Sequence, residues 1–172
     1  MTYRTKTYVA GDWTGDQDLI AKLYEWNDRD DLKLHFVDAH ELTQARDTSL
    51  YCSIKKSLSE RLDASKTFVL IVGNKTSSLT KGSCQYCPSY DSYHASCHRG
   101  GNVDYRSYIQ YECEKAKRDN LKILVIYNYA TVIKSKCPET LRNIGIHING
   151  LYCRDGKYYW NYPEIKKALC SE

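Results

Sequence analysis

Two short, almost unbroken apolar runs constrain the fold of this chain more than any other feature. Residues 67–72 read Thr-Phe-Val-Leu-Ile-Val, and residues 123–127 read Ile-Leu-Val-Ile-Tyr. Strands that are buried on both faces have this composition, and such strands lie in the middle of a parallel sheet covered by helices. The two runs therefore predict the centre of an α/β sheet.

The rest of the pattern alternates strands with helices. Further strands are expected at residues 6–10, 32–37 and near 146–148, and the main helices at residues 19–26, 49–62, 104–119 and 163–170. Five strands interleaved with helices favour right-handed crossovers and a sheet covered on both faces. We therefore expect a flavodoxin-like, three-layer α/β/α fold with a five-stranded parallel sheet in the order 2-1-3-4-5.

The length of the chain, 172 residues, fits one domain spanning residues 1–172, and there is no internal repeat. Residues 74–103 show no periodic pattern, which predicts a long loop inserted after the third strand. Loops of this length are uncommon within compact domains, and those that occur are often functional.

Composition excludes several classes of protein. The net charge is +4, from 25 basic and 21 acidic residues spread without a basic block, which argues against a nucleic-acid partner. No apolar run is long enough to span a membrane. The first eight residues lack the apolar stretch of a secretory signal, so we expect a cytoplasmic protein whose eight cysteines form no disulfide framework.

The predicted strand order places a crevice outside the carboxyl ends of strands one and three, where sheets of this kind usually bind ligands. Asp12 and Trp13 follow the first strand, and Asn74 follows the third. Asp12 could bond a ribose hydroxyl while Trp13 stacks on a base, although both could simply form a capped turn. Asp38 and His40 follow the second strand and are expected at the rim of the site.

Glu112 is the residue with the most informative position. The apolar stripe of its predicted helix consists of Tyr105, Tyr108, Ile109 and Ala116. Glu112 lies four residues after Tyr108 and four before Ala116, in the middle of that stripe. An inward-facing carboxylate needs hydrogen-bond donors or a cation, or it remains protonated. The pattern leaves open a structural ion pair and an active-site acid.

A group of cysteines and histidines lies in the predicted long loop. Cys84 and Cys87 form a Cys-x-x-Cys pair, and His94 and Cys97 follow closely. Four such soft ligands could hold a structural zinc ion in tetrahedral geometry. A redox pair, or small residues packed in a folded loop, are the alternatives.

Taken in order, these segments resemble a TIR (Toll/interleukin-1 receptor) domain, and more narrowly the bacterial TIR-like proteins of the Thoeris antiphage defence system. The resemblance is carried by residues 8–13 (Tyr-Val-Ala-Gly-Asp-Trp), 53–62, 65–73 and 105–112, and it covers about the first 130 residues. It implies a TIR-like version of the fold expected above.

The resemblance also implies an activity. Glu112 would occupy the position of the catalytic glutamate, which in enzymatic TIR domains serves cleavage of the nicotinamide–ribose bond of NAD. NAD would be the substrate, with no catalytic metal. A carboxylate there can stabilise the oxocarbenium-like charge that develops on the ribose. Tyr108 stands where many TIR domains carry Trp and would line the pocket.

Two classes of function follow. The first is a TIR-like immune enzyme that, on a phage-derived trigger, converts NAD into an ADP-ribose-derived messenger, expected to be cyclic, that activates an effector protein. The second is a non-catalytic TIR-like adaptor, in which Glu112 is part of an ion pair and surface tyrosines mediate assembly. A flavodoxin-like response regulator is less favoured, because Gly73 and Asn74 stand where a phospho-acceptor aspartate is expected.

Overall fold

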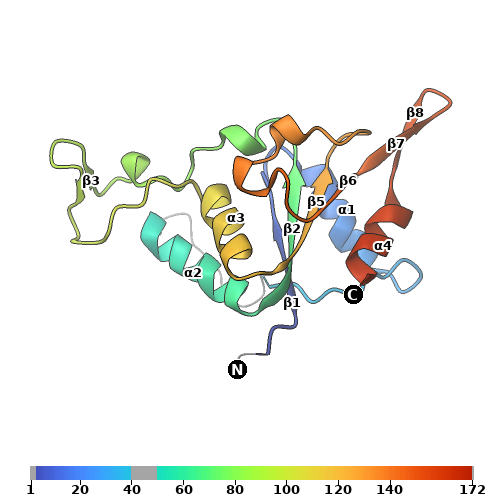
Figure 1. The fold of residues 1–172 in the computed structure, drawn as a ribbon, viewed down its shortest axis with the longest axis horizontal. Coiled ribbons are helices and arrows are strands. Elements are labelled where there is room, and N and C mark those ends of the chain that lie inside the picture. The colour runs from blue at the N-terminus through green and yellow to red at the C-terminus, as the bar shows by residue number, and fades with distance from the viewer. Residues whose placement is uncertain (1–2, 40–49, 172) are drawn as a thin grey trace.

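A parallel sheet forms the centre of the protein. The computed structural model describes residues 3–39 and 50–171 (Figure 1). In spatial order the four strands are β1 (Lys6–Ala10), β2 (Ser65–Val72), β5 (Lys122–Tyr127) and β6 (Ile146–Asn149), and each neighbouring pair is parallel. The two apolar runs form β2 and β5, side by side in the middle of the sheet. The α/β class and the parallel sheet are therefore confirmed.

Helices cover both faces of this sheet, as Figure 1 shows. On one face lie α1 (Gln17–Asp28) and α4 (Tyr162–Cys170), and on the other lie α2 (Tyr51–Asp63) and α3 (Tyr108–Arg118). Alternate side chains of each strand serve different cores: Phe68 and Leu70 pack with α2 and α3, whereas Val69 and Ile71 pack with α1 and α4. This alternation explains why residues 68–72 of β2 and 123–127 of β5 are continuously apolar or aromatic.

The prediction of five strands is wrong for the described part of the chain, because the expected second strand is irregular. His35 has a φ of +58°, which takes the chain out of the extended conformation. Both backbone groups of Phe36 bond to the side chain of Asn27 instead of a neighbouring strand, at 2.9 and 3.1 Å. One parallel bridge, between Thr7 and Asp38, connects this segment to β1.

The connection from β2 to α3 is long and carries only short elements. They are the 3-10 turns η2 (Thr76–Ser78) and η3 (Cys84–Tyr86) and the antiparallel pair β3 (Tyr90–Asp91) and β4 (Ser96–Cys97). The backbone N–H of Cys84 donates to the carbonyl of Asp104 at 3.0 Å, so the chain leaves and returns at one point.

A buried lysine anchors the returning end of this connection to α2. The Nζ of Lys55 donates to the carbonyls of Asp104 (3.2 Å) and Arg106 (2.7 Å), and it also pairs with the Asp104 carboxylate at 3.2 Å. Ser107 and Gln110 then form a reciprocal capping box, which begins α3 at Tyr108. The helix predicted from residue 104 therefore begins four residues later.

The carboxyl-terminal part adds elements outside the central sheet. The short 3-10 turns η4 (Lys134–Lys136) and η5 (Glu139–Leu141) lead from β5 to β6. A hairpin of β7 (Leu151–Arg154) and β8 (Lys157–Trp160) then projects from the body (Figure 1). Its turn is Asp155-Gly156, with φ values of +52° and +74°.

Candidate active site

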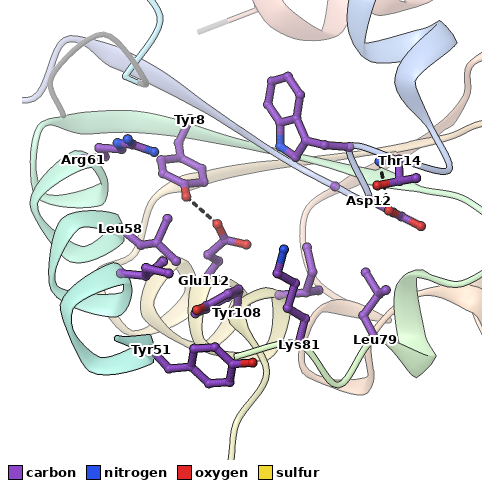
Figure 2. A pocket seen from close by; sticks show the side chains of 14 residues that line it. Tyr8, Asp12, Thr14, Tyr51, Leu58, Arg61, Leu79, Lys81, Tyr108 and Glu112 are labelled. Carbon is purple, nitrogen blue, oxygen red and sulfur yellow. Dashed lines mark hydrogen bonds between the residues drawn. The ribbon is translucent and has the colours of Figure 1, made fainter. Parts of the chain in front are cut away.

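A pocket opens at the carboxyl end of β1, between α2 and α3 (Figure 2). Its volume is about 330 Å³, at the lower end of the range for small-molecule sites. Four segments contribute to its wall: β1 with the loop after it, α2, the loop after β2, and α3. The lining residues that carry polar or aromatic groups are Tyr8, Asp12, Trp13, Thr14, Tyr51, Arg61, Lys81, Tyr108 and Glu112.

Glu112 lies in the wall of this pocket and is only 6% exposed. The burial follows from the helix period, because Ile109 and Ala116 on the same face of α3 pack in the core. The predicted inward orientation of Glu112 is therefore confirmed. Tyr105, expected on the same stripe, is exposed because it precedes the first turn of α3.

The hydroxyl of Tyr8 donates a hydrogen bond to Oε1 of Glu112 (Figure 2). Tyr8 is fully buried, and burial raises the pKa of its phenol well above the ordinary value, so the hydroxyl keeps its proton. Burial also raises the pKa of Glu112 to about 7, while the Tyr8 hydrogen bond and the positive charge of Arg61 act in the opposite direction. The carboxyl group can therefore gain or lose its proton near neutral pH.

Two tyrosines form an aromatic wall beside this carboxyl group. The rings of Tyr51, at the start of α2, and Tyr108, at the start of α3, meet edge to face with centroids 5.7 Å apart. Burial raises the pKa of Tyr108, so its hydroxyl also stays protonated. The predicted position of Tyr108 in the pocket is confirmed.

The loop after β1 supplies the opposite side. Asp12 Oδ1 accepts a hydrogen bond from the backbone N–H of Thr14 at 3.1 Å, which holds the acidic side chain in a tight turn. Trp13 is 48% exposed, and its ring centroid lies 6.2 Å from that of Tyr24. A half-exposed indole next to a cavity is available for stacking. Asp12 and Trp13 are thus brought together with Glu112.

The structure does not bring Asp38 or Asn74 into the pocket. Asp38 lies beside β1, where its carbonyl accepts from Lys6 Nζ at 3.4 Å. Asn74 is exposed and accepts from Lys136 Nζ at 2.7 Å. Neither residue lines the cavity. The prediction for His40 lies outside the described residues.

Among the pocket residues that escaped the sequence analysis are Tyr8, Tyr51, Arg61 and Lys81. Only Tyr8 carried a usable signal, because alternation along the first strand places it on the opposite face from Val9. Arg61 is 7% exposed on the buried side of α2, a rare environment for an arginine.

The predicted zinc ligands are not assembled as a set. Cys84, Cys87 and Cys97 line a small hollow together with Cys52 of α2. His94 lies apart from it, with a largely exposed side chain whose Nδ1 is 2.6 Å from Asp91 Oδ2. Across residues 3–39 and 50–171, no three His, Cys, Asp or Glu side chains are grouped so that they could hold a metal ion. The bond to Asp91 explains why His94 does not join the cysteines.

A comparison with protein families identifies the amino-terminal part of the chain. Residues 8–81 match the family described as Thoeris protein ThsB, TIR-like domain. This segment is similar to that of a Thoeris TIR-like protein, and we call it the Thoeris TIR-like segment. Thoeris is an antiphage defence system, so this similarity supports a role in antiphage defence signalling. No curated protein matches the chain.

The Thoeris TIR-like segment supplies three of the four segments of the pocket wall, and α3 supplies the fourth. The Thoeris TIR-like segment contains β1, α1, α2 and β2, and its last residue is Lys81 in the pocket wall. Glu112 and Tyr108 lie beyond it, on α3.

Within the described ranges, no helix is both long and apolar enough to cross a membrane.

Proposed function

We propose that this protein is a TIR-like signalling enzyme that cleaves NAD at the nicotinamide–ribose bond. One observation carries the proposal: a buried carboxyl group with a pKa of about 7 lies in the wall of a pocket and is bonded to a neutral phenol. Perturbed acids in clefts are typical of active sites. The Thoeris TIR-like match supports this choice of reaction.

The geometry supports a dissociative cleavage. The bond between nicotinamide and C1′ of the ribose breaks with its electron pair on the nicotinamide nitrogen, and positive charge develops on the sugar. Ionised Glu112 would stabilise this charge, strongly so because a buried site screens it little. Asp12 would accept a hydrogen bond from a ribose hydroxyl, and Trp13 and Tyr108 would flank the planar ring.

The resulting cation can react in two ways, which give two different products. Attack by water, with loss of a proton, gives ADP-ribose. Attack by a nitrogen of the adenine in the same molecule gives a cyclic product. In this proposal a cyclic ADP-ribose-derived messenger diffuses through the cytoplasm to an effector protein. A phage-derived component or self-assembly starts the reaction.

Nicotinamide release provides the test. Purified protein is incubated with NAD, and nicotinamide and ADP-ribose products are separated by chromatography. Glu112→Gln is expected to lower the rate at least about 100-fold, the usual effect of removing a group that stabilises transition-state charge. The matched control is Glu114→Gln on the same helix, whose exposed carboxylate pairs with Arg106. Equal rates for wild type and Glu112→Gln would refute the assignment.

The same assay distinguishes the adaptor. It is repeated with lysates of phage-infected cells, which supply a trigger if one is needed. Absence of nicotinamide release under both conditions, with the protein folded, would reject the enzyme and support a non-catalytic scaffold.

A further inference from the structure

Lys81 places an ammonium group in the wall of the pocket. Lys81 is exposed and lines the cavity. Among residues 3–39 and 50–171 it makes no side-chain hydrogen bond or ion pair, and Figure 2 shows its side chain extending into the pocket. By contrast, Lys55 and Lys115 are both held by carboxylates. Within residues 3–39 and 50–171, no carboxylate pairs with the Lys81 ammonium group, which leaves this cation available to a ligand.

The backbone of Lys81 is nevertheless fixed. Its carbonyl accepts from the N–H of Tyr108 at 2.9 Å, at the first residue of α3. The next residue, Gly82, has a φ of +102°, and a Cβ there would lie 2.4 Å from the Tyr108 ring. Only glycine fits at this close approach. The backbone of Lys81 is thus fixed to Tyr108, which precedes Glu112 by one turn of α3, and its side chain extends toward the cavity (Figure 2).

Size and charge together indicate what such a lysine binds. A volume of about 330 Å³ can enclose only part of a dinucleotide. If the ribose lies at Glu112, the remainder must leave across the mouth of the pocket. The group next to that ribose in NAD is a diphosphate, and lysine is a common phosphate ligand.

We propose that Lys81 binds the diphosphate of the dinucleotide and thereby selects nucleotides over nucleosides at this site. The inference rests on the proposed function, because it takes the position of the ribose from Glu112. It assigns a specificity-determining role to a residue at the end of the Thoeris TIR-like segment, outside α3.

The test is a binding measurement with turnover stopped. All variants carry Glu112→Gln, and calorimetry measures their affinity for ADP-ribose and for nicotinamide riboside, which has no phosphate. We expect Lys81→Gln to weaken ADP-ribose binding about tenfold, the loss of one charge-assisted contact, and to change nicotinamide riboside binding less than about twofold. The ADP-ribose effect should shrink at high salt, because the ammonium group is exposed.

Two controls make the test specific. Lys56→Gln removes an exposed lysine of α2 that does not line the pocket, and it should leave both affinities unchanged. Lys81→Arg keeps the charge and should restore most of the ADP-ribose affinity. Equal losses for both ligands, no loss for ADP-ribose, or the same loss in Lys56→Gln would each overturn the inference.

The outcome is separable from that of the proposed function. Suppose that the protein with native Glu112 releases nicotinamide and that Lys81→Gln leaves the affinity for ADP-ribose unchanged. This result would reject the diphosphate contact and keep the enzyme. Binding of ADP-ribose that depends on Lys81, without any release, would reject the enzyme and keep the diphosphate site.

Discussion

The pair formed by Tyr8 and Glu112 joins residues 104 positions apart in the sequence. β1 delivers the phenol and α3 delivers the carboxyl group, so the contact exists only when the sheet and helix are packed together. A neutral donor satisfies the buried acid without fixing its charge. An arginine in direct contact would instead favour the ionised form over a much wider pH range.

Tyr8→Phe should therefore change the pH dependence of the proposed reaction. The substitution removes a hydrogen bond that lowers the pKa of Glu112, so this pKa should rise above about 7. A hydrogen bond to a charged group contributes about 1.5–3 kcal/mol, which corresponds to a shift of about one to two pH units. The rising limb of kcat/KM for nicotinamide release should move upward by this amount.

The shape of the profile is decisive for this prediction. At a pH above both pKa values, the variant should regain most of its activity, because Glu112 is then ionised in both proteins. Arg61 and its charge remain in place in the variant. A uniform loss of activity with an unchanged profile would show that Tyr8 supports only the fold.

How far the site could be predicted differs from residue to residue. Glu112 was found because helical periodicity places a carboxylate in an apolar stripe. Lys81 and Arg61 could not be found, because their approach to Glu112 depends on how separate segments pack. Asp38 was misplaced because its position followed from a regular second strand, which the chain does not form.

At the scale of elements, the anchoring of the long connection depends on Lys55. Hydrogen bonds from Arg106 and the charge of Lys55 outweigh burial and lower the pKa of Asp104 to about 2. The stabilisation linked to this carboxylate is therefore present above its ordinary pKa of 3.8 and is lost as the pH falls through about 2.

Lys55→Met should destabilise the protein by about 3 kcal/mol at neutral pH. The substitution leaves two carbonyls without their donor and the Asp104 carboxylate without one of its cations. Urea unfolding measures the effect, and Lys56→Met on the exposed side of α2 is the matched control. The prediction fails if the two variants have the same stability.

Local signals explain which elements could be read from the sequence. The apolar runs identified β2 and β5 because they contain no glycine, proline or charged residue that would favour another structure. The second strand failed because Asn27 replaces the ladder partner of Phe36, which alternation of apolar residues cannot reveal. The hairpin of β7 and β8 did carry a signal, an Asp155-Gly156 turn between two segments that contain tyrosine and tryptophan.

For the molecule as a whole, Glu112 links stability to pH. Its pKa is 4.5 ordinarily and about 7 in the folded protein, so the folded state holds the proton more tightly. Stability from this group is fully present below pH 4.5 and is lost as the pH rises through about 7. The shift corresponds to about 3 kcal/mol.

Glu112→Gln should therefore become relatively more stable as the pH increases. Glutamine has no charge to bury, so the free energy of unfolding of the variant relative to wild type should rise by about 3 kcal/mol between pH 4.5 and pH 8. Urea unfolding of both proteins under reducing conditions measures this. A difference that is independent of pH would contradict the raised pKa of Glu112.

The long connection has a consequence for the architecture. Because the chain departs at Cys84 and comes back at Asp104, and hydrogen bonds join these two residues, the residues between them form a module whose ends are fixed to each other. Its size can vary without altering the spacing between the two walls of the pocket. We therefore expect a replacement module of another length to leave the pocket in place if its ends are joined as Cys84 and Asp104 are.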